Sequence, residues 1–423
     1  MNRIISLAFV FFATAFLTTS CAIQSTKLTA APFKSSESFD RTFQKALAEI
    51  EGTPELSLGY VNLAMLYMKE SRKTGDFSLN DKAASAVAKA LEIAPNDIPA
   101  RKLEASLHLA HHRFAEAVDA AKKLSTDAPN DSFVYGVLAD AYIEVGEYKK
   151  AVEAAQKMVD LKPGTASYSR VAQLRSLYGD HKGAVEMFTQ AARAADPSDV
   201  ETQNWCLVQL GDEFWKNGKY VDAERVYDEA LRNYPGYFLA LVSKARVRAS
   251  LDDYAGAEKL LTDVQLDRPN ANAILMLGDI YSLRGEIEKA EAQYAQFDAI
   301  QANLGTAADH RRLVLSWAAR GKVDQALELA TSEYAAEKSI YSADLLAWSL
   351  FKVGRAAEAR TYIAEAMRLK TNDARTLYHA GMIAKANGDR REAKQLLSVA
   401  LELNPAFDLV QAIDARKALA EVR

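Results

Sequence analysis

A helix-pair pattern returns ten times along the chain, about every 34 residues. The last copy begins at Ala374, which we number position 1, and runs to Ala406. Leu377 then falls at position 4, Gly381 at position 8 and Ala393 at position 20. Apolar residues at positions 4, 7, 8 and 11 form one stripe of a first helix, and those at 20, 24 and 27 form a stripe of a second. Because one such hairpin cannot bury its own stripe, neighbouring copies must stack.

The other nine copies follow the same frame with varying completeness. Small residues at positions 8 and 20 let the two helices approach closely, Gly at position 15 suits the turn, and Pro at position 32 begins the next unit. The first copy needs an extra loop of about seven residues near 71–78 to stay in phase. The clearest markers are Tyr135, Ala139, Gly146 and Ala151 in copy three, Gly211, Gly218, Ala223 and Tyr227 in copy five, Gly278, Gly285 and Ala290 in copy seven, and Ala347, Gly354 and Ala359 in copy nine.

These residues resemble the tetratricopeptide repeat (TPR) pattern, which has small residues at 8, Ala at 20 and 27 and Pro near 32. The resemblance is clearest in residues 207–231, 346–360 and 377–408 and covers nearly the whole mature chain. It implies an all-α fold, a right-handed α-solenoid of about ten hairpins whose first helices line a concave groove. The chain is similar to exported bacterial TPR proteins, which implies a scaffold role without a named partner.

Composition is that of an ordinary soluble protein, with 49% hydrophobic and 26% charged residues. The net charge of −4 comes without the clustered Lys and Arg that nucleic-acid binding requires, so no nucleic-acid partner is expected. The unbroken repeat predicts one continuous array rather than the three domains that length alone suggests. We expect the solenoid to span residues 38–405, with a capping helix near residues 39–50, and a final capping helix in residues 406–423.

The amino-terminal residues indicate export. A short positive segment precedes an apolar run at 4–17, which is too short to span a membrane. The following residues, 18–21, resemble the bacterial lipobox, although Thr18 stands where Leu is usual. We therefore predict a signal peptide at 1–20, lipid on Cys21 and a flexible tether at 21–37. Cleavage by ordinary signal peptidase without lipid is the alternative.

The predicted signal peptide and lipid anchor indicate that the protein lies in the bacterial cell envelope. Two or more acyl chains on Cys21 would give a stable membrane anchor. Ala22 is not the Asp associated with inner-membrane retention, so the resemblance to lipoproteins points to the outer membrane if the source has two membranes.

Catalytic and metal-binding patterns are not found in the sequence. It contains no P-loop, no GxGxxG after a strand, no GxSxG and no HExxH. His108, His111 and His112 lie where a first helix ends, so helix termination explains them better than metal ligation. Cys206 has no basic neighbour that would activate it and is expected to be a buried thiol. We predict a non-catalytic protein without cofactor or metal.

A binding groove would be formed by positions 2, 5, 9 and 12 of the first helices. Large aromatic residues often anchor partners, and several occupy these positions. The alternative is that the same rings pack between adjacent repeats. The aromatic candidates are Trp205 and Trp215 in copy five, Tyr341, Trp348 and Phe351 in copy nine, and Tyr378 in copy ten.

Charged residues complete the predicted groove. Asp212, Arg246 and Asp279 hold position 9 in three successive copies and would form a ladder of alternating sign. A solvated charge row that fixes repeat register is the competing interpretation. The sequence favours an envelope-associated scaffold that binds a peptide or protein partner in the groove. The alternative function is a binder of a small molecule or cell-wall polymer that supports envelope enzymes.

Overall fold

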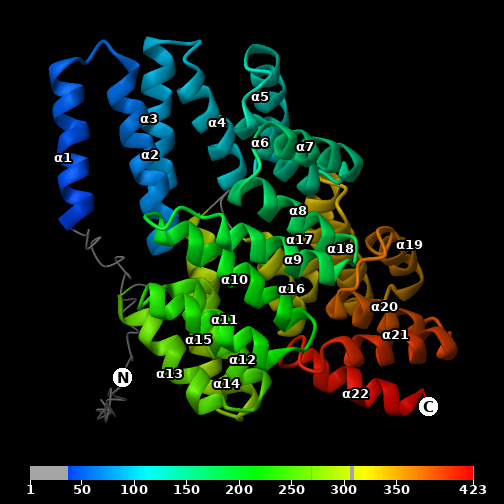
Figure 1. Ribbon diagram of the computed structural model, residues 1–423. Coiled ribbons are helices and arrows are strands. Elements are labelled where there is room, and N and C mark those ends of the chain that lie inside the picture. The colour runs from blue at the N-terminus through cyan, green and yellow to red at the C-terminus, as the bar shows by residue number, and fades with distance from the viewer. Residues whose placement is uncertain (1–36, 268, 305–308, 423) are drawn as a thin grey trace, which may run out of the picture. The chain divides into compact units, whose positions relative to one another are not determined.

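Antiparallel helix pairs repeat through the structure, as the 34-residue pattern predicts (Figure 1). The structure is a computed structural model that describes residues 37–267, 269–304 and 309–422. These ranges contain 22 helices and no strand, so the prediction of an all-α helical repeat fold is confirmed. The predicted signal peptide, the lipid-bearing Cys21 and nearly all of the predicted tether lie outside the described residues.

The helices have lengths typical of repeat hairpins. In chain order they are α1 (Glu37–Gly52), α2 (Ser57–Thr74), α3 (Leu79–Ile93), α4 (Ile98–Ala110), α5 (Phe114–Asp127), α6 (Ser132–Glu144), α7 (Tyr148–Leu161), α8 (Thr165–Leu177), α9 (His181–Arg193), α10 (Val200–Lys216), α11 (Tyr220–Asn233), α12 (Phe238–Ser250), α13 (Tyr254–Asp267), α14 (Ala271–Leu283), α15 (Ile287–Leu304), α16 (His310–Ala319), α17 (Val323–Ala336), α18 (Ile340–Lys352), α19 (Ala356–Ala366), α20 (Ala374–Ala386), α21 (Arg390–Leu403) and α22 (Gln411–Glu421).

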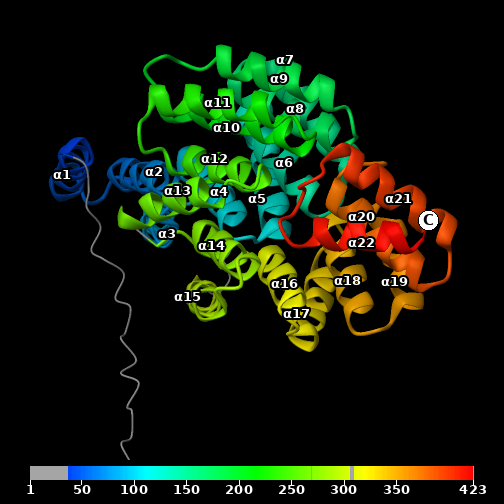
Figure 2. The same cartoon turned by 90° about the horizontal axis from the view of Figure 1, so that it is seen from below.

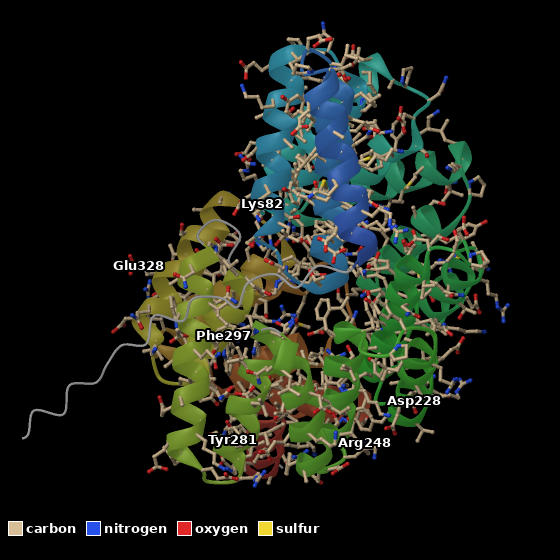
Figure 3. The ribbon with its side chains drawn as sticks, turned by 90° about the vertical axis from the view of Figure 1, so that its left-hand side faces the viewer. Lys82, Asp228, Arg248, Tyr281, Phe297 and Glu328 are labelled. Atoms are coloured by element: carbon tan, nitrogen blue, oxygen red, sulfur yellow. The ribbon has the colours of Figure 1, made fainter. Side chains whose placement is uncertain are left out.

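Ten hairpins account for the helices from α2 to α21, and we number them as repeats one (α2 and α3) to ten (α20 and α21). Most first helices also contact the first helix of the next repeat, and α1 packs on α2 while α22 packs on α21 and α20. Repeats seven and eight join through a small cluster of Ile274, Phe297 and Leu313, in which Phe297, labelled in Figure 3, is fully buried.

The repeat markers act through packing and capping. In repeat five the Tyr227 ring occupies the space that a Cβ on Gly211 would need, so the small residue at position 8 lets the second helix approach. Alanines at position 20, such as Ala223, are completely buried. Several first helices begin with an Asp cap whose side chain accepts a hydrogen bond from the helix backbone, namely Asp97, Asp131, Asp199, Asp309 and Asp373.

Position 15 takes a left-handed conformation in the turn of each repeat from two to ten. Glycine supplies it in most repeats, for example with φ of 80° at Gly146 and 83° at Gly354. His112 and Asp252 hold the same position in repeats two and six, with φ of 54° and 61°. In repeat one the extra residues do not all form a loop as expected, because α2 continues to Thr74 before the turn.

The array also turns back on itself, so that repeats far apart in sequence touch. We call these contacts the seam, and Figure 2 shows part of it where the red segment before α22 passes beside α10 and α11. In each case the turn of an early repeat meets the residues that precede a later helix. The seam joins Gly146 and Tyr148 to residues 338–340, Gly179 and His181 to residues 370–372, and Gly218 and Tyr220 to residues 403–406.

No helix among the described residues is long and apolar enough to cross a membrane.

Candidate functional site

The surface formed by positions 2, 5, 9 and 12 of the first helices, called here the first-helix face, includes position-9 side chains that form ion pairs between neighbouring repeats. Arg170 of α8 donates to the Asp140 carboxylate of α6 at 2.6 Å. Arg246 of α12 donates to the Asp212 carboxylate of α10 at 2.5 Å. These pairs link adjacent first helices, so they help to fix how one repeat sits on the next.

Three of the predicted groove residues meet in one cluster. The Arg246 guanidinium lies over the Trp215 ring, 4.1 Å from its centroid, while it is paired with Asp212. Asp212 also accepts a hydrogen bond from the Tyr227 hydroxyl at 2.6 Å, and the Trp215 indole donates to Ser250 at 3.0 Å. The cluster is partly buried and largely satisfied within the chain, so it presents a rigid aromatic and cationic surface.

Asp279 does not join this cluster, and the predicted ladder of three charges is therefore wrong beyond Asp212 and Arg246. The Asp279 carboxylate accepts a hydrogen bond from Tyr294 at 2.9 Å, within its own hairpin. Burial, together with the nearby Asp408 carboxylate, raises the pKa of Asp279 to about 7. A carboxyl group in this setting gains little from ionisation. Arg246 pairs with Asp212 through one terminal nitrogen, while its Nε is buried without a hydrogen-bond partner.

Trp348 and Tyr378 are packing residues in this structure, as the alternative interpretation held. They are only 3% and 2% exposed. Trp348 stacks on His379 with ring centroids 4.1 Å apart and on the half-buried Phe351 at 5.0 Å. His379 donates from Nδ1 to Asp344 at 2.9 Å. These contacts bind α18 to α20, and a partner could reach Trp348 only if the two helices separated.

The remaining aromatic candidates are half-buried. Trp205 packs against the apolar cluster of repeat five. Tyr341 lies under the Arg311 guanidinium, which is 3.7 Å from the ring centroid. Arg311 also reaches Glu144 of α6 at 3.5 Å, so this pair sits beside the seam. Tyr341 thus resembles Trp215 in having a cation over its ring.

Two exposed residues of repeat one were not among the predicted groove residues, although they hold groove positions in the repeat. Leu58 and Met65 occupy positions 2 and 9 of α2 and are 62% and 47% exposed. They are seven residues apart and so share one face of the helix. Phe133, at position 2 of α6, is also exposed. The first-helix face is therefore most accessible and apolar in the early repeats.

The reactive candidates have structural roles. Cys206 is completely buried, and burial raises the pKa of its thiol to about 12, which confirms the prediction of a buried structural cysteine. His112 holds the left-handed turn position, and His111 lies 3.1 Å from Asp81. Across the described ranges no group of three or more His, Cys, Asp or Glu side chains could hold a metal ion.

Family comparisons agree with the repeat frame. Family models described as tetratricopeptide repeat match residues 102–166 and 208–268, and a further one matches 374–407. These matches identify tetratricopeptide repeats in the chain over those residues. Its fold is that of a protein-interaction scaffold, and proteins of this kind are generally non-catalytic. No curated protein matches the sequence.

Solved structures of helical repeat proteins are similar at low identity. The crystal structure of PilW, a type IV pilus biogenesis factor, is 18% identical, with 48% of this chain and 93% of that chain covered and a TM-score of 0.40. Yeast Tom70 is 14% identical over 91% of this chain and 93% of that one, with a TM-score of 0.39. Human IFIT1, as a dimer with m7Gppp-AAAA, is 14% identical over 78% and 76%, with a TM-score of 0.49. Similarity of this degree transfers no partner or ligand.

Proposed function

We propose that this protein is a non-catalytic scaffold of the bacterial cell envelope that binds a peptide segment of a partner protein on its first-helix face. The observation that carries the proposal is the contrast between Met65 and Trp348. Both hold position 9, yet Met65 is 47% exposed and Trp348 is 3% exposed. The early repeats keep apolar side chains accessible at positions that repeat nine uses for internal packing.

An accessible apolar face favours a protein partner. Leu58, Met65 and Phe133 are exposed large apolar residues on the first helices of repeats one and three. Exposed large apolar side chains are typical of interaction sites, because removing them from water stabilises a complex. The half-buried rings of Trp205 and Trp215 extend the aromatic character of the face into repeat five and would supply rigid anchors.

Crosslinking in envelope extracts tests this proposal. The double variant Leu58→Glu with Met65→Glu places two charges on the face and is expected to lose the crosslinked partner. The matched control is Val221→Glu, because Val221 is 81% exposed on the second helix α11 and lies off the first-helix face. Retention of the same partner by a folded double variant would contradict the proposal. Titration that shows binding of peptidoglycan fragments, with no protein captured, would favour the polymer-binding alternative.

We further propose that Cys21 carries the membrane anchor. The support is the short positive and apolar segment before residues 18–21 and the position of Cys21 ahead of the helical array. Cys21→Ser should leave the repeats folded but release the protein from the membrane fraction or block its processing. Mass spectrometry of the mature amino terminus decides the matter, since an unmodified terminus on the wild-type protein would mean secretion without an anchor.

A further inference from the structure

Position 17, the first residue of the second helix, provides a polar contact in each of the three parts of the seam. In repeats three, four and five it is Tyr148, His181 and Tyr220. The Tyr148 hydroxyl accepts from the Ile340 backbone N–H at 2.7 Å. The Tyr220 hydroxyl donates to the Asn404 side chain at 2.5 Å and accepts from the Ala406 N–H at 3.1 Å. In each of these three repeats the position-17 side chain thus connects an early turn to the chain about six repeats later.

His181 holds the middle of this row through both ring nitrogens. Its Nδ1 lies 2.5 Å from Oε1 of Glu213, and its Nε2 lies 3.1 Å from the backbone carbonyl oxygen of Asn372. A carbonyl oxygen and an ionised carboxylate accept hydrogen bonds but donate none. Both ring nitrogens must therefore donate, which only the protonated imidazolium can do.

The surroundings keep Glu213 ionised. Its side chain is fully buried, and Ser176 of α8 donates to it at 2.7 Å. Burial opposes ionisation, but the hydrogen bond from His181 and the charge of Lys216 outweigh it, so the pKa of the Glu213 carboxyl is lowered. A neutral Glu213 that donates to the ring is therefore not the stable arrangement. The contact is a charged bridge from α10 through His181 to the residues before α20.

We propose that His181 is a protonation-controlled latch that holds the seam closed when its imidazole is charged and lets the seam loosen when it is neutral. The neutral ring has a single N–H and must face either Glu213 or Asn372 with a lone pair directed at an oxygen. The charged groups around it are Glu213 and Lys216 of α10, Arg175 of α8, Asp180 and Lys182 beside it, and Lys370 and Asp373 beside Asn372. The inference concerns how the array holds itself and does not depend on the proposed partner.

The other seam side chains do not change charge with pH at ordinary values. Burial raises the pKa of Tyr148 to about 12, and burial also raises that of Tyr220, so both hydroxyls stay neutral at ordinary pH. Thr371 donates to the Leu177 carbonyl oxygen at 2.5 Å, but a hydroxyl of this kind does not titrate. Among these position-17 anchors, His181 is the one with an imidazole, the side chain that proteins use most often as a pH switch.

Pulsed electron paramagnetic resonance tests the latch. Spin labels are placed on exposed Lys182→Cys in α9 and Lys394→Cys in α21 of the full chain carrying Cys21→Ser, and distances are measured at pH 5.5 and pH 8.5. A longer distance population is expected to appear at pH 8.5. His181→Gln, which is neutral at every pH, should show that population at both pH values.

His310→Gln is the matched control, because His310 pairs with Glu333 at 2.8 Å within the single hairpin of α16 and α17. This variant should keep the pH-dependent change. A wild-type distance that does not vary with pH, or a change that persists in His181→Gln, overturns the proposal. If His181→Gln does not fold, nitrogen-15 spectra of labelled histidine decide the question, since a ring of His181 that is neutral at pH 5.5 also overturns it.

Discussion

The turns of repeats three to five and those of repeats seven to ten have the same local structure and different surroundings. Both sets place glycine in the left-handed conformation at position 15. A Cβ on Gly146, Gly179 or Gly218 would meet the backbone carbonyl of residue 338, 370 or 403 across the seam. A Cβ on the equivalent glycine of repeats seven to ten, such as Gly354, would meet nothing within 4 Å.

This comparison separates two roles that the repeat pattern combines. Glycine at position 15 is favoured by the turn itself, because the left-handed conformation is costly for other residues wherever the turn lies. Position 17 adds hydrogen bonds across the seam, and it is Tyr, His and Tyr in repeats three to five but Ile287, Val323, Ala356 and Arg390 in repeats seven to ten. The repeat motif makes the hairpin, and residues outside the motif decide which hairpins meet again.

Gly146→Ala compared with Gly354→Ala should give the largest difference. The left-handed conformation alone costs about 1–2 kcal/mol, which is all that Gly354→Ala should lose. Gly146→Ala should lose about 3 kcal/mol or more, because the new methyl group also overlaps the Lys338 carbonyl oxygen. Urea unfolding of both variants measures the difference. Equal losses would mean that the seam does not form in solution.

Tyr220→Phe should have a smaller effect that again is confined to the seam. It removes the hydroxyl that serves both Asn404, which is fully buried, and the Ala406 N–H. A loss of about 1–3 kcal/mol is expected from unsatisfied buried groups. Tyr254 holds the same position in repeat six, where its hydroxyl donates to the nearby Asp252 on the exposed surface. Tyr254→Phe should therefore change the free energy of unfolding by less than about 0.5 kcal/mol. A loss as large as that of Tyr220→Phe would show that the effect does not come from the seam.

Asp252→Gly should give the smallest change in the free energy of unfolding, and this change should stabilise the protein. Asp252 adopts φ of 61° at the position that glycine holds in most repeats. Glycine removes the steric cost of this conformation but adds chain entropy to the unfolded state, so a net gain of about 0.5 kcal/mol is expected. Thermal unfolding of the variant measures it. A loss of stability would show that the Asp252 side chain contributes more than its backbone conformation costs.

Much of the fold follows from the sequence because its determinants are local. Position 8 and position 20 are small where helices cross, position 15 is glycine where the chain turns, and aspartate begins several first helices. Each of these requirements acts within one hairpin or at its border with the next. The seam could not be predicted in the same way. Tyr148, His181 and Tyr220 lie outside the motif, and their partners are more than 180 residues away.

The exposure of the candidate site residues could not be predicted from the sequence. Met65 and Trp348 both hold position 9, yet Met65 is exposed and Trp348 is buried. The difference arises from neighbours: α18 packs between α16 and α20, whereas α2 has a first helix, α4, on one side. The charge ladder failed for a similar reason, since Tyr294 holds Asp279 within its own repeat. A side chain's accessibility depends on contacts that its own repeat does not encode.

The seam also bears on how the chain folds. Tyr148 and Ile340 are 192 residues apart, and His181 and Asn372 are 191 apart. Arrays stabilised only by neighbouring repeats can fold from any point and open repeat by repeat. Closing a loop of this length carries an entropic cost that local contacts do not, so the seam should form late and slowly. During synthesis the first five repeats emerge with their position-17 side chains still hydrated. Only when the last repeats arrive can the two halves begin to unfold and refold as one cooperative unit.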